Sequence, residues 1–363
     1  MNRLPKVSIL QLRALIVSAM IGIGIMSLPS SLVSEMGNDG WIAIVLSGLL
    51  MLPIAAIIIQ IFKINPDKDL FQIGKETLGS IVFTVCELIL AVYFIVFAAF
   101  LVRNLAELIK AFLLPTTPLE IVMLAFIVAT SYIACNEIDV IARATYFIYP
   151  IILAFVTILV LMAIPESDFS NLLPLFQTDI STLPKGIQSA FFSYTGFELI
   201  IFAIPYVKEK EKILKSCFIG IGTVTFIYFA MFVMVVVQLS SKQIERLNFP
   251  VIQISKQLDL PGYFLENLDG LVMALWIIVV FATMAPVYFG AGKIFSKIFK
   301  TKGHKYFIWA LIPVIYQVAL MPDNFLEIQT RLAKVLDILA FISIVIIPVL
   351  ILSVGYIRKK VKS

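Results

Sequence analysis

The sequence predicts an all-α integral membrane protein of ten transmembrane helices, in which the first and the sixth helix are broken near their middles. The chain has 363 residues, of which 61% are hydrophobic and only 14% are charged. A soluble domain of this size cannot bury so much apolar surface. The apolar residues form runs of about 20 residues, the length that spans a bilayer as a helix. Two of these runs are interrupted halfway by glycine-containing motifs.

Ten apolar runs define the predicted membrane spans. Their approximate ranges are 12–34, 41–62, 81–109, 119–136, 143–164, 185–207, 214–239, 264–291, 304–321 and 334–357. Aromatic residues near several ends, such as Trp41 and Trp309, suit a membrane interface. We expect one transmembrane domain with two halves, repeat one at about 12–164 and repeat two at about 185–357.

The basic residues predict the orientation in the membrane. With the N-terminus in the cytoplasm, 20 of the 28 lysines and arginines fall on the cytoplasmic side. They lie in segments 3–13, 63–75, 143, 208–215, 293–305 and 358–362. This bias follows the positive-inside rule, and an even number of spans places the C-terminus in the cytoplasm too.

Span one is expected to break at the motif 21–29, Ile-Gly-Ile-Gly-Ile-Met-Ser-Leu-Pro. Gly22 and Gly24 weaken the helix, and Pro29 removes a backbone donor about a turn later. About ten residues separate Leu12 from Gly22, and this length of helix, roughly 15 Å, reaches the bilayer midplane.

Span six carries the motif 191–198, Phe-Phe-Ser-Tyr-Thr-Gly-Phe-Glu, again near its middle. The motif ends in a carboxylate, Glu198, at membrane depth. An ionisable group there costs at least about 2.5 kcal/mol on insertion scales, so it needs a reason to be present. We expect Glu198 to couple ligand binding to closure or to pair with a cation; alternatively, it satisfies loose backbone amides of the break.

Broken helices at positions one and six are typical of a five-plus-five inverted repeat, where the breaks meet at the midplane and form a binding site. Glycines also serve close helix packing, so each motif alone leaves both interpretations open. The two motifs together predict a site. Its predicted ligand-binding residues are Gly22, Ile23, Gly24, Ile25, Met26, Tyr93, Phe97, Phe192, Tyr194, Thr195, Gly196 and Thr283.

The chain directions predict the ligand. The outer half of span one begins near Gly24–Met26, where free N–H groups suit a carboxylate. The outer half of span six ends near Phe192–Tyr194, where free carbonyls suit an ammonium group. A zwitterion, in the simplest case a free α-amino acid, fits both ends, and the apolar walls favour a small or medium apolar side chain.

Catalytic, cofactor and metal-binding functions have no support in the sequence. The cysteines Cys86, Cys135 and Cys217 lie in or beside apolar runs without metal-ligand spacing. His304 lies among lysines in a short loop and is expected to be solvated. Arg103 and Glu107, four residues apart, are expected to pair at the outer surface. We predict no enzyme activity, cofactor or metal site.

The motifs together resemble the B subunit of the nutrient germinant receptors of spore-forming bacteria, the endospore germination permease family of the amino acid–polyamine–organocation superfamily. Phe249 and Asn267 depart from that family's usual tryptophan and frequent arginine. The resemblance covers nearly the whole chain and depends on residues 21–29, 40–41, 112–118, 194–198, 249–252 and 260–266.

The resemblance implies an amino acid permease (LeuT-like) fold in the spore inner membrane, with receptor A and C subunits as partners and no nucleic acid. It implies a germinant pocket between spans one, three, six and eight. Two other functions stay open: a proton- or ion-coupled amino acid permease, and a passive scaffold. Span eight lacks a run of hydroxyls around Thr283 and span five lacks a central lysine, which favours the receptor over the permease.

Overall fold

The computed structural model describes residues 6–22, 24–66, 68–257 and 268–362. Ile23, the motif 260–266 and Asn267 lie outside these residues. The helices are α1 (Ile9–Met20), α2 (Gly24–Met36), α3 (Gly40–Ile64), α4 (Leu70–Leu78), α5 (Ser80–Phe112), α6 (Leu119–Ala134), α7 (Ile138–Ala163), α8 (Leu183–Ser193), α9 (Ile200–Ala203), α10 (Ile213–Gln238), α11 (Ser241–Ile244), α12 (Pro250–Gln257), α13 (Leu268–Ile298), α14 (Lys305–Leu320), α15 (Phe325–Glu327), α16 (Ala333–Phe341) and α17 (Ile347–Lys362).

Each predicted span overlaps helical residues; the two breaks are not helical, and Ile23 and residues 264–267 are not described. By length and apolar composition, six helical stretches of the described residues can cross a membrane. One of these, Gly24–Ile64, joins α2 to α3, and the bent pair Ile180–Ser193 with Phe197–Tyr206 makes a seventh. The apolar helices α1, α6 and α14 are shorter, with 12, 16 and 16 residues.

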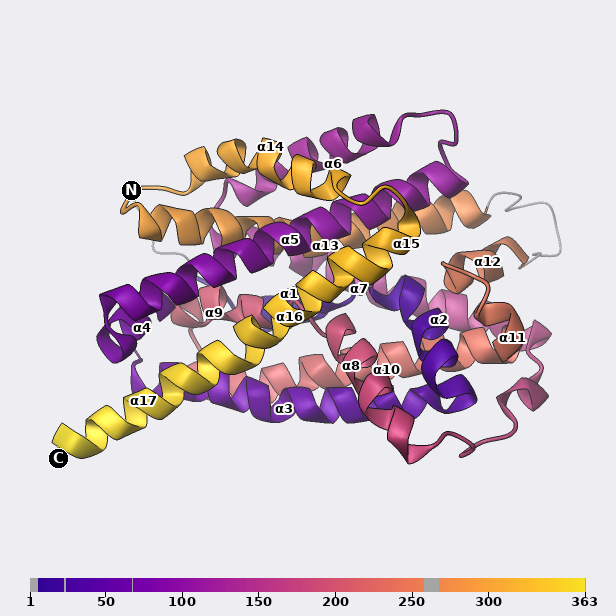
Figure 1. Cartoon of the computed structure of the whole chain (residues 1–363), viewed down its shortest axis with the longest axis horizontal. Coiled ribbons are helices and arrows are strands. Elements are labelled where there is room, and N and C mark those ends of the chain that lie inside the picture. Colours follow the sequence, from indigo (N-terminus) through magenta and orange to yellow (C-terminus); the bar gives the residue numbers. More distant parts are fainter. Residues whose placement is uncertain (1–5, 23, 67, 258–267, 363) are drawn as a thin grey trace.

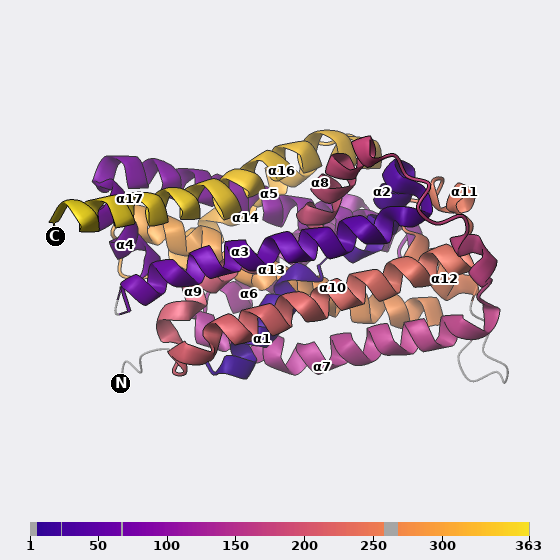
Figure 2. The ribbon, with the colours of Figure 1, turned by 90° about the horizontal axis from the view of Figure 1, so that it is seen from below.

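The long helices lie roughly along one axis of the molecule (Figures 1 and 2). α5 packs along α13, and α3 packs along α10, while α1 lies inside, against α7, α10 and α13. α16 and α17 run diagonally across the outside (Figure 1). The N- and C-termini lie at the same end in both views, which we call the termini end.

Both predicted helix breaks are present. α1 ends at Met20, with Ile21 as its C-cap, and helical structure resumes at Gly24 as α2. α8 ends at Ser193, and the chain continues through a turn and a 3-10 segment, Phe197–Leu199, before α9. The two halves of this sixth span are bent by 41°. The glycine-containing motifs therefore identified both breaks correctly, whereas α2 continues through Pro29.

The chain start and the end of the broken sixth span are joined at the termini end. The N–H of Val7 donates to the carbonyl of Tyr206 at 3.0 Å, and the N–H of Lys208 donates to the carbonyl of Val7 at 3.4 Å. The Val7 side chain is fully buried. This contact closes the bundle on the termini side of the breaks.

The prediction that His304 is solvated is wrong. His304 is 2% exposed, and its Nε2 lies 3.1 Å from the carbonyl oxygens of both Ala134 and Asn136. Its ring meets Phe289 edge-on, with the ring centroids 4.9 Å apart. The neighbouring lysines suggested a solvated loop. The folded chain instead places the His304 side chain inside, against the end of α6.

Candidate ligand-binding site

The two helix breaks touch one another inside the bundle. Gly196 has a φ of +101°, a left-handed conformation that favours glycine. A Cβ placed on Gly196 would lie 2.4 Å from the carbonyl oxygen of Ala19, so only glycine allows this approach. At the other side, a Cβ on Gly24 would lie 3.2 Å from Oγ of Ser193. The glycines thus let the two interrupted helices meet.

Hydroxyl groups from neighbouring helices bond the carbonyls at the broken ends. The phenol of Tyr228, on α10, lies 2.6 Å from the carbonyl oxygen of Met20 and 2.7 Å from that of Ser193. Thr283, on α13, donates to the carbonyl of Ser18 at 2.7 Å. Protein donors therefore serve the C-terminal ends of α1 and α8, where the one O–H of Tyr228 is shared between the carbonyls of Met20 and Ser193.

A small cavity lies between the two breaks and α5. Its volume is about 10 Å³, about the room that one water molecule needs. Pockets for small-molecule ligands hold roughly 300–1,000 Å³, so the site is contracted in this conformation. The cavity is lined by Ala19, Met20, Gly22, Gly24, Phe97, Phe100, Leu101, Phe192, Ser193, Thr195 and Thr283.

Six of the predicted ligand-binding residues line this cavity: Gly22, Gly24, Phe97, Phe192, Thr195 and Thr283. Ile25 and Met26 are buried in the first turn of α2 without lining it. Gly196 packs on Ala19 instead. Ile23 lies outside the described residues.

Two predicted tyrosines point elsewhere. The phenol of Tyr194 donates to the carbonyl of Ile44 at 2.9 Å and lies 3.0 Å from Oγ1 of Thr225. The phenol of Tyr93 donates to Glu198. Both side chains are fully buried but do not line the cavity. Their hydrogen bonds join the helices around it.

Sequence reasoning missed Phe100, Leu101, Ser193 and Tyr228. Phe100 and Leu101 lie three and four residues after Phe97, so helical spacing could have identified them. Ser193 lies in the motif of span six. Tyr228 had no local signal, because it is one aromatic residue in an ordinary apolar run.

Glu198 lies directly after the second break and is 1% exposed. One carboxylate oxygen accepts a hydrogen bond from the phenol of Tyr93 at 2.6 Å, and the other accepts one from the N–H of Gly196 at 2.9 Å. The carboxylate therefore satisfies a loose amide of the break and also ties the break to α5. Among the described residues, no group of three or more His, Cys, Asp or Glu side chains is placed to hold a metal ion.

Comparison with known sequences identifies the family. Residues 6–328 match the family described as "Spore germination protein" (Spore permease). The chain belongs to the spore germination protein family. This membership confirms the resemblance that its motifs predicted, and it places the chain among multi-pass membrane proteins that are not enzymes.

Relatives in this spore germination family match along most of the chain. Spore germination protein YndE of Bacillus subtilis (strain 168) is 26% identical over 320 residues, 88% of each chain. Spore germination protein B2 of the same organism is 24% identical over 361 residues, covering 98% of this chain and 97% of its own.

Solved structures of other proteins share the fold of this spore germination protein. MhsT in complex with L-phenylalanine superposes with a TM-score of 0.68 at 15% identity, over 98% of this chain and 99% of that one. Mhp1, a nucleobase-cation-symport-1 family transporter in a closed conformation, gives a TM-score of 0.68 at 13% identity, over 94% and 78%. At these identities the likeness establishes the LeuT-like fold alone.

Proposed function

We propose that this chain is the membrane subunit of a nutrient germinant receptor, which binds a small nutrient between its two broken helices and passes the signal to partner subunits. The observation that carries the proposal is the direct contact of the two breaks, Gly196 on Ala19 and Gly24 beside Ser193. In folds of this type, broken helices that meet near the midplane form the binding site.

The ligand that suits these ends is a free α-amino acid. α2 begins at Gly24, so the N–H groups of its first turn have no partner within the helix and favour a carboxylate. The carbonyl of Phe192 accepts hydrogen bonds from both the N–H and the hydroxyl of Thr195, so an ammonium group bonds it only after the Thr195 hydroxyl turns away. The apolar rings of Phe97, Phe100 and Phe192 suit an apolar side chain.

The proposed topology has ten spans, with α1–α2 as the first, α8–α9 as the sixth and α15–α17 as the tenth. The five spans up to α7 and the five from α8 onward then form two repeats. Both termini lie at one end, which supports an even number of crossings. The positive-inside bias favours the cytoplasm at that end, in the inner membrane of the spore.

Binding requires the contracted cavity to open. A ligand changes the conformational equilibrium only by its differential affinity for the open and closed states. An amino acid cannot enter about 10 Å³, so it binds the open state alone and separates the breaks. We propose that Glu198 and Tyr93 transmit this movement to α5, and that the receptor A and C subunits respond.

A cation-coupled permease is the competing function, and the hydroxyl caps argue against it. In ion-coupled carriers of this architecture, the carbonyls of unwound helices coordinate the ion. Here the phenol of Tyr228 lies within hydrogen-bond distance of the carbonyls of Met20 and Ser193 and donates to one of them, and Thr283 donates to the carbonyl of Ser18. These hydroxyl groups bond the carbonyl oxygens that would otherwise coordinate a coupling cation.

Valine substitutions at Thr195 and Thr283 test the proposal. Loss of one polar contact with the ligand should shift the germinant concentration for half-maximal germination by roughly 2- to 10-fold, or change which nutrient acts. The matched control is Thr130→Val, because Thr130 is fully buried but bonds only its own helix. Unchanged responses at normal protein levels would contradict the proposal. Uptake of labelled amino acid into proteoliposomes that contain this chain alone would favour the permease.

A further inference from the structure

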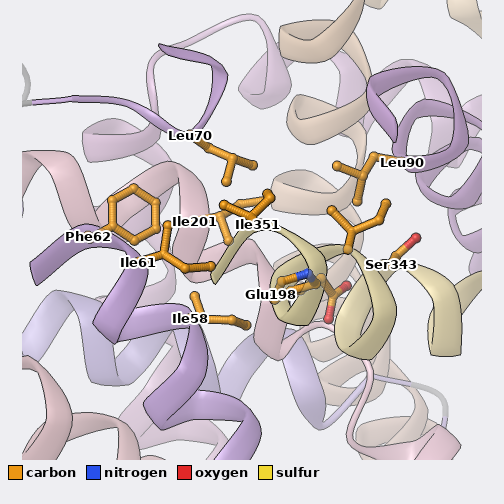
Figure 3. A pocket seen from close by; sticks show the side chains of 11 residues that line it. Ile58, Ile61, Phe62, Leu70, Leu90, Glu198, Ile201, Ser343 and Ile351 are labelled. Carbon is orange, nitrogen blue, oxygen red and sulfur yellow. The ribbon is translucent and has the colours of Figure 1, made fainter. Parts of the chain in front are cut away.

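A second small cavity, lined by Glu198, lies where α3, α5 and α9 meet the junction of α16 and α17 (Figure 3). Its volume is about 20 Å³. Leucine, isoleucine and phenylalanine side chains form most of its wall. The exceptions are Glu198, Ser343 and Pro348.

The polar groups of this cavity are incompletely bonded. The Ser343 side chain is 3% exposed, and its hydroxyl has no hydrogen-bond partner among the described residues. Each oxygen of Glu198 accepts one hydrogen bond and has a lone pair left. A buried hydroxyl without a partner is costly, so a native structure needs an explanation for it.

The backbone adds a third polar group. Residues Ile342–Ile346 form a single π-helical turn, the kind of widened turn that is frequent at functional sites. Pro348 follows it and supplies no N–H. The carbonyl four or five residues before Pro348, that of Ile344 or Ser343, therefore lacks the donor that an N–H at position 348 would supply.

We propose that this cavity binds one ordered water molecule that links Glu198 to Ser343. A volume of about 20 Å³ exceeds the roughly 10–15 Å³ that one water needs, and a buried water typically has two to four polar partners. The water accepts a hydrogen bond from the Ser343 hydroxyl and donates to Glu198 and to the free carbonyl. A hard metal cation prefers six or more oxygen ligands, which this wall does not supply.

The water would connect two parts of the receptor that are far apart in sequence. Glu198 follows the break of the sixth span, and Ser343 lies in the π turn before α17, which ends at the C-terminus. If the proposed function holds, opening of the ligand site moves Glu198 and, through the water, the tenth span. Binding of the water molecule does not depend on that function, so its test uses no germinant.

The sign of the stability change in Ser343→Ala tests the proposal. If water bridges Ser343 and Glu198, the substitution removes a partner of the water and lowers the melting temperature of the purified protein by a few degrees. If the hydroxyl is simply unpartnered, the substitution removes an unsatisfied buried group and leaves the melting temperature unchanged or raised. Ser131→Ala is the control, because Ser131 is fully buried and bonds only Val128 of its own helix.

Two further measurements complete the test. With a shared water, the effects of Ser343→Ala and Glu198→Gln should be non-additive in a double-mutant cycle; additive effects would contradict the link. Density for one water in a high-resolution structure of the wild type, absent from Ser343→Val, is the direct expectation. A Ser343→Ala effect that differs among sodium, potassium and choline chloride would overturn the proposal in favour of a cation.

Discussion

At the scale of a single residue, Gly196 determines whether the two broken helices can meet. Its left-handed backbone costs other residue types roughly 1–2 kcal/mol. A side-chain carbon there would also press on the Ala19 carbonyl, which is backbone and cannot rotate away. Conformation and close approach therefore require glycine at the same position.

Gly196→Ala should lower the melting temperature of the purified protein by several degrees, because the turn and α1 must separate. Gly222→Ala is a matched control within α10, where no heavy atom lies within 4 Å of the added carbon. Alanine is about 1 kcal/mol better than glycine inside a helix, so this control should melt at or above the wild-type temperature. Equal melting of the two variants would show that the breaks do not depend on Gly196.

At the scale of elements, the half-helices α1 and α8 end inside the protein, where water cannot satisfy their last carbonyls. A phenol from α10 and a hydroxyl from α13 bond to carbonyls at these ends instead. The unbroken helices α10 and α13 thereby fix the positions of the ends of α1 and α8. We infer that the small volume of the site depends on these hydrogen bonds as well as on the breaks.

Tyr228→Phe removes the phenol and leaves the carbonyls of Met20 and Ser193 without this donor. We expect a loss of about 1–3 kcal/mol in the free energy of unfolding, measured by thermal melting in detergent. Tyr306→Phe serves as the control, because Tyr306 is 83% exposed. A wild-type protein whose melting temperature falls when choline replaces sodium would contradict the view that protein donors fill the place of a cation.

At the scale of the whole molecule, the placement of both termini at one end sets a testable topology. In intact cells, an impermeant maleimide should label Ile180→Cys, which lies in the loop before α8 and is 84% exposed at the native residue. Lys359→Cys, near the exposed end of α17, should react only after the membrane is permeabilised. The native cysteines are replaced by serine first. Equal labelling of both positions before permeabilisation would disprove the proposed orientation.

Local chemistry was enough to predict the helices and their breaks. Apolar runs set where the long helices form, and glycines mark the two breaks, because these preferences act within a few residues of the chain. Proline does not have this effect here, since α3, α7, α13 and α14 each continue through one. Spacing also predicted the pair of Arg103 and Glu107, which lies at 3.0 Å. The spacing did not predict how deeply the pair is buried. Arg103 is 5% exposed and donates to the carbonyl of Ala319, on α14.

The remaining features depend on partners from distant parts of the chain. The sequence predicts Tyr93, like Phe97, as a ligand-binding residue, yet the phenol of Tyr93 donates to Glu198, 105 positions later. Tyr228 and Ser343 showed no local pattern, because their importance comes from what the folded bundle places beside them. The amino-acid order alone therefore specified a membrane bundle with two interrupted helices. Long-range packing decided which hydroxyls cap those interruptions, how small the site between them is, and that Glu198 faces a second cavity.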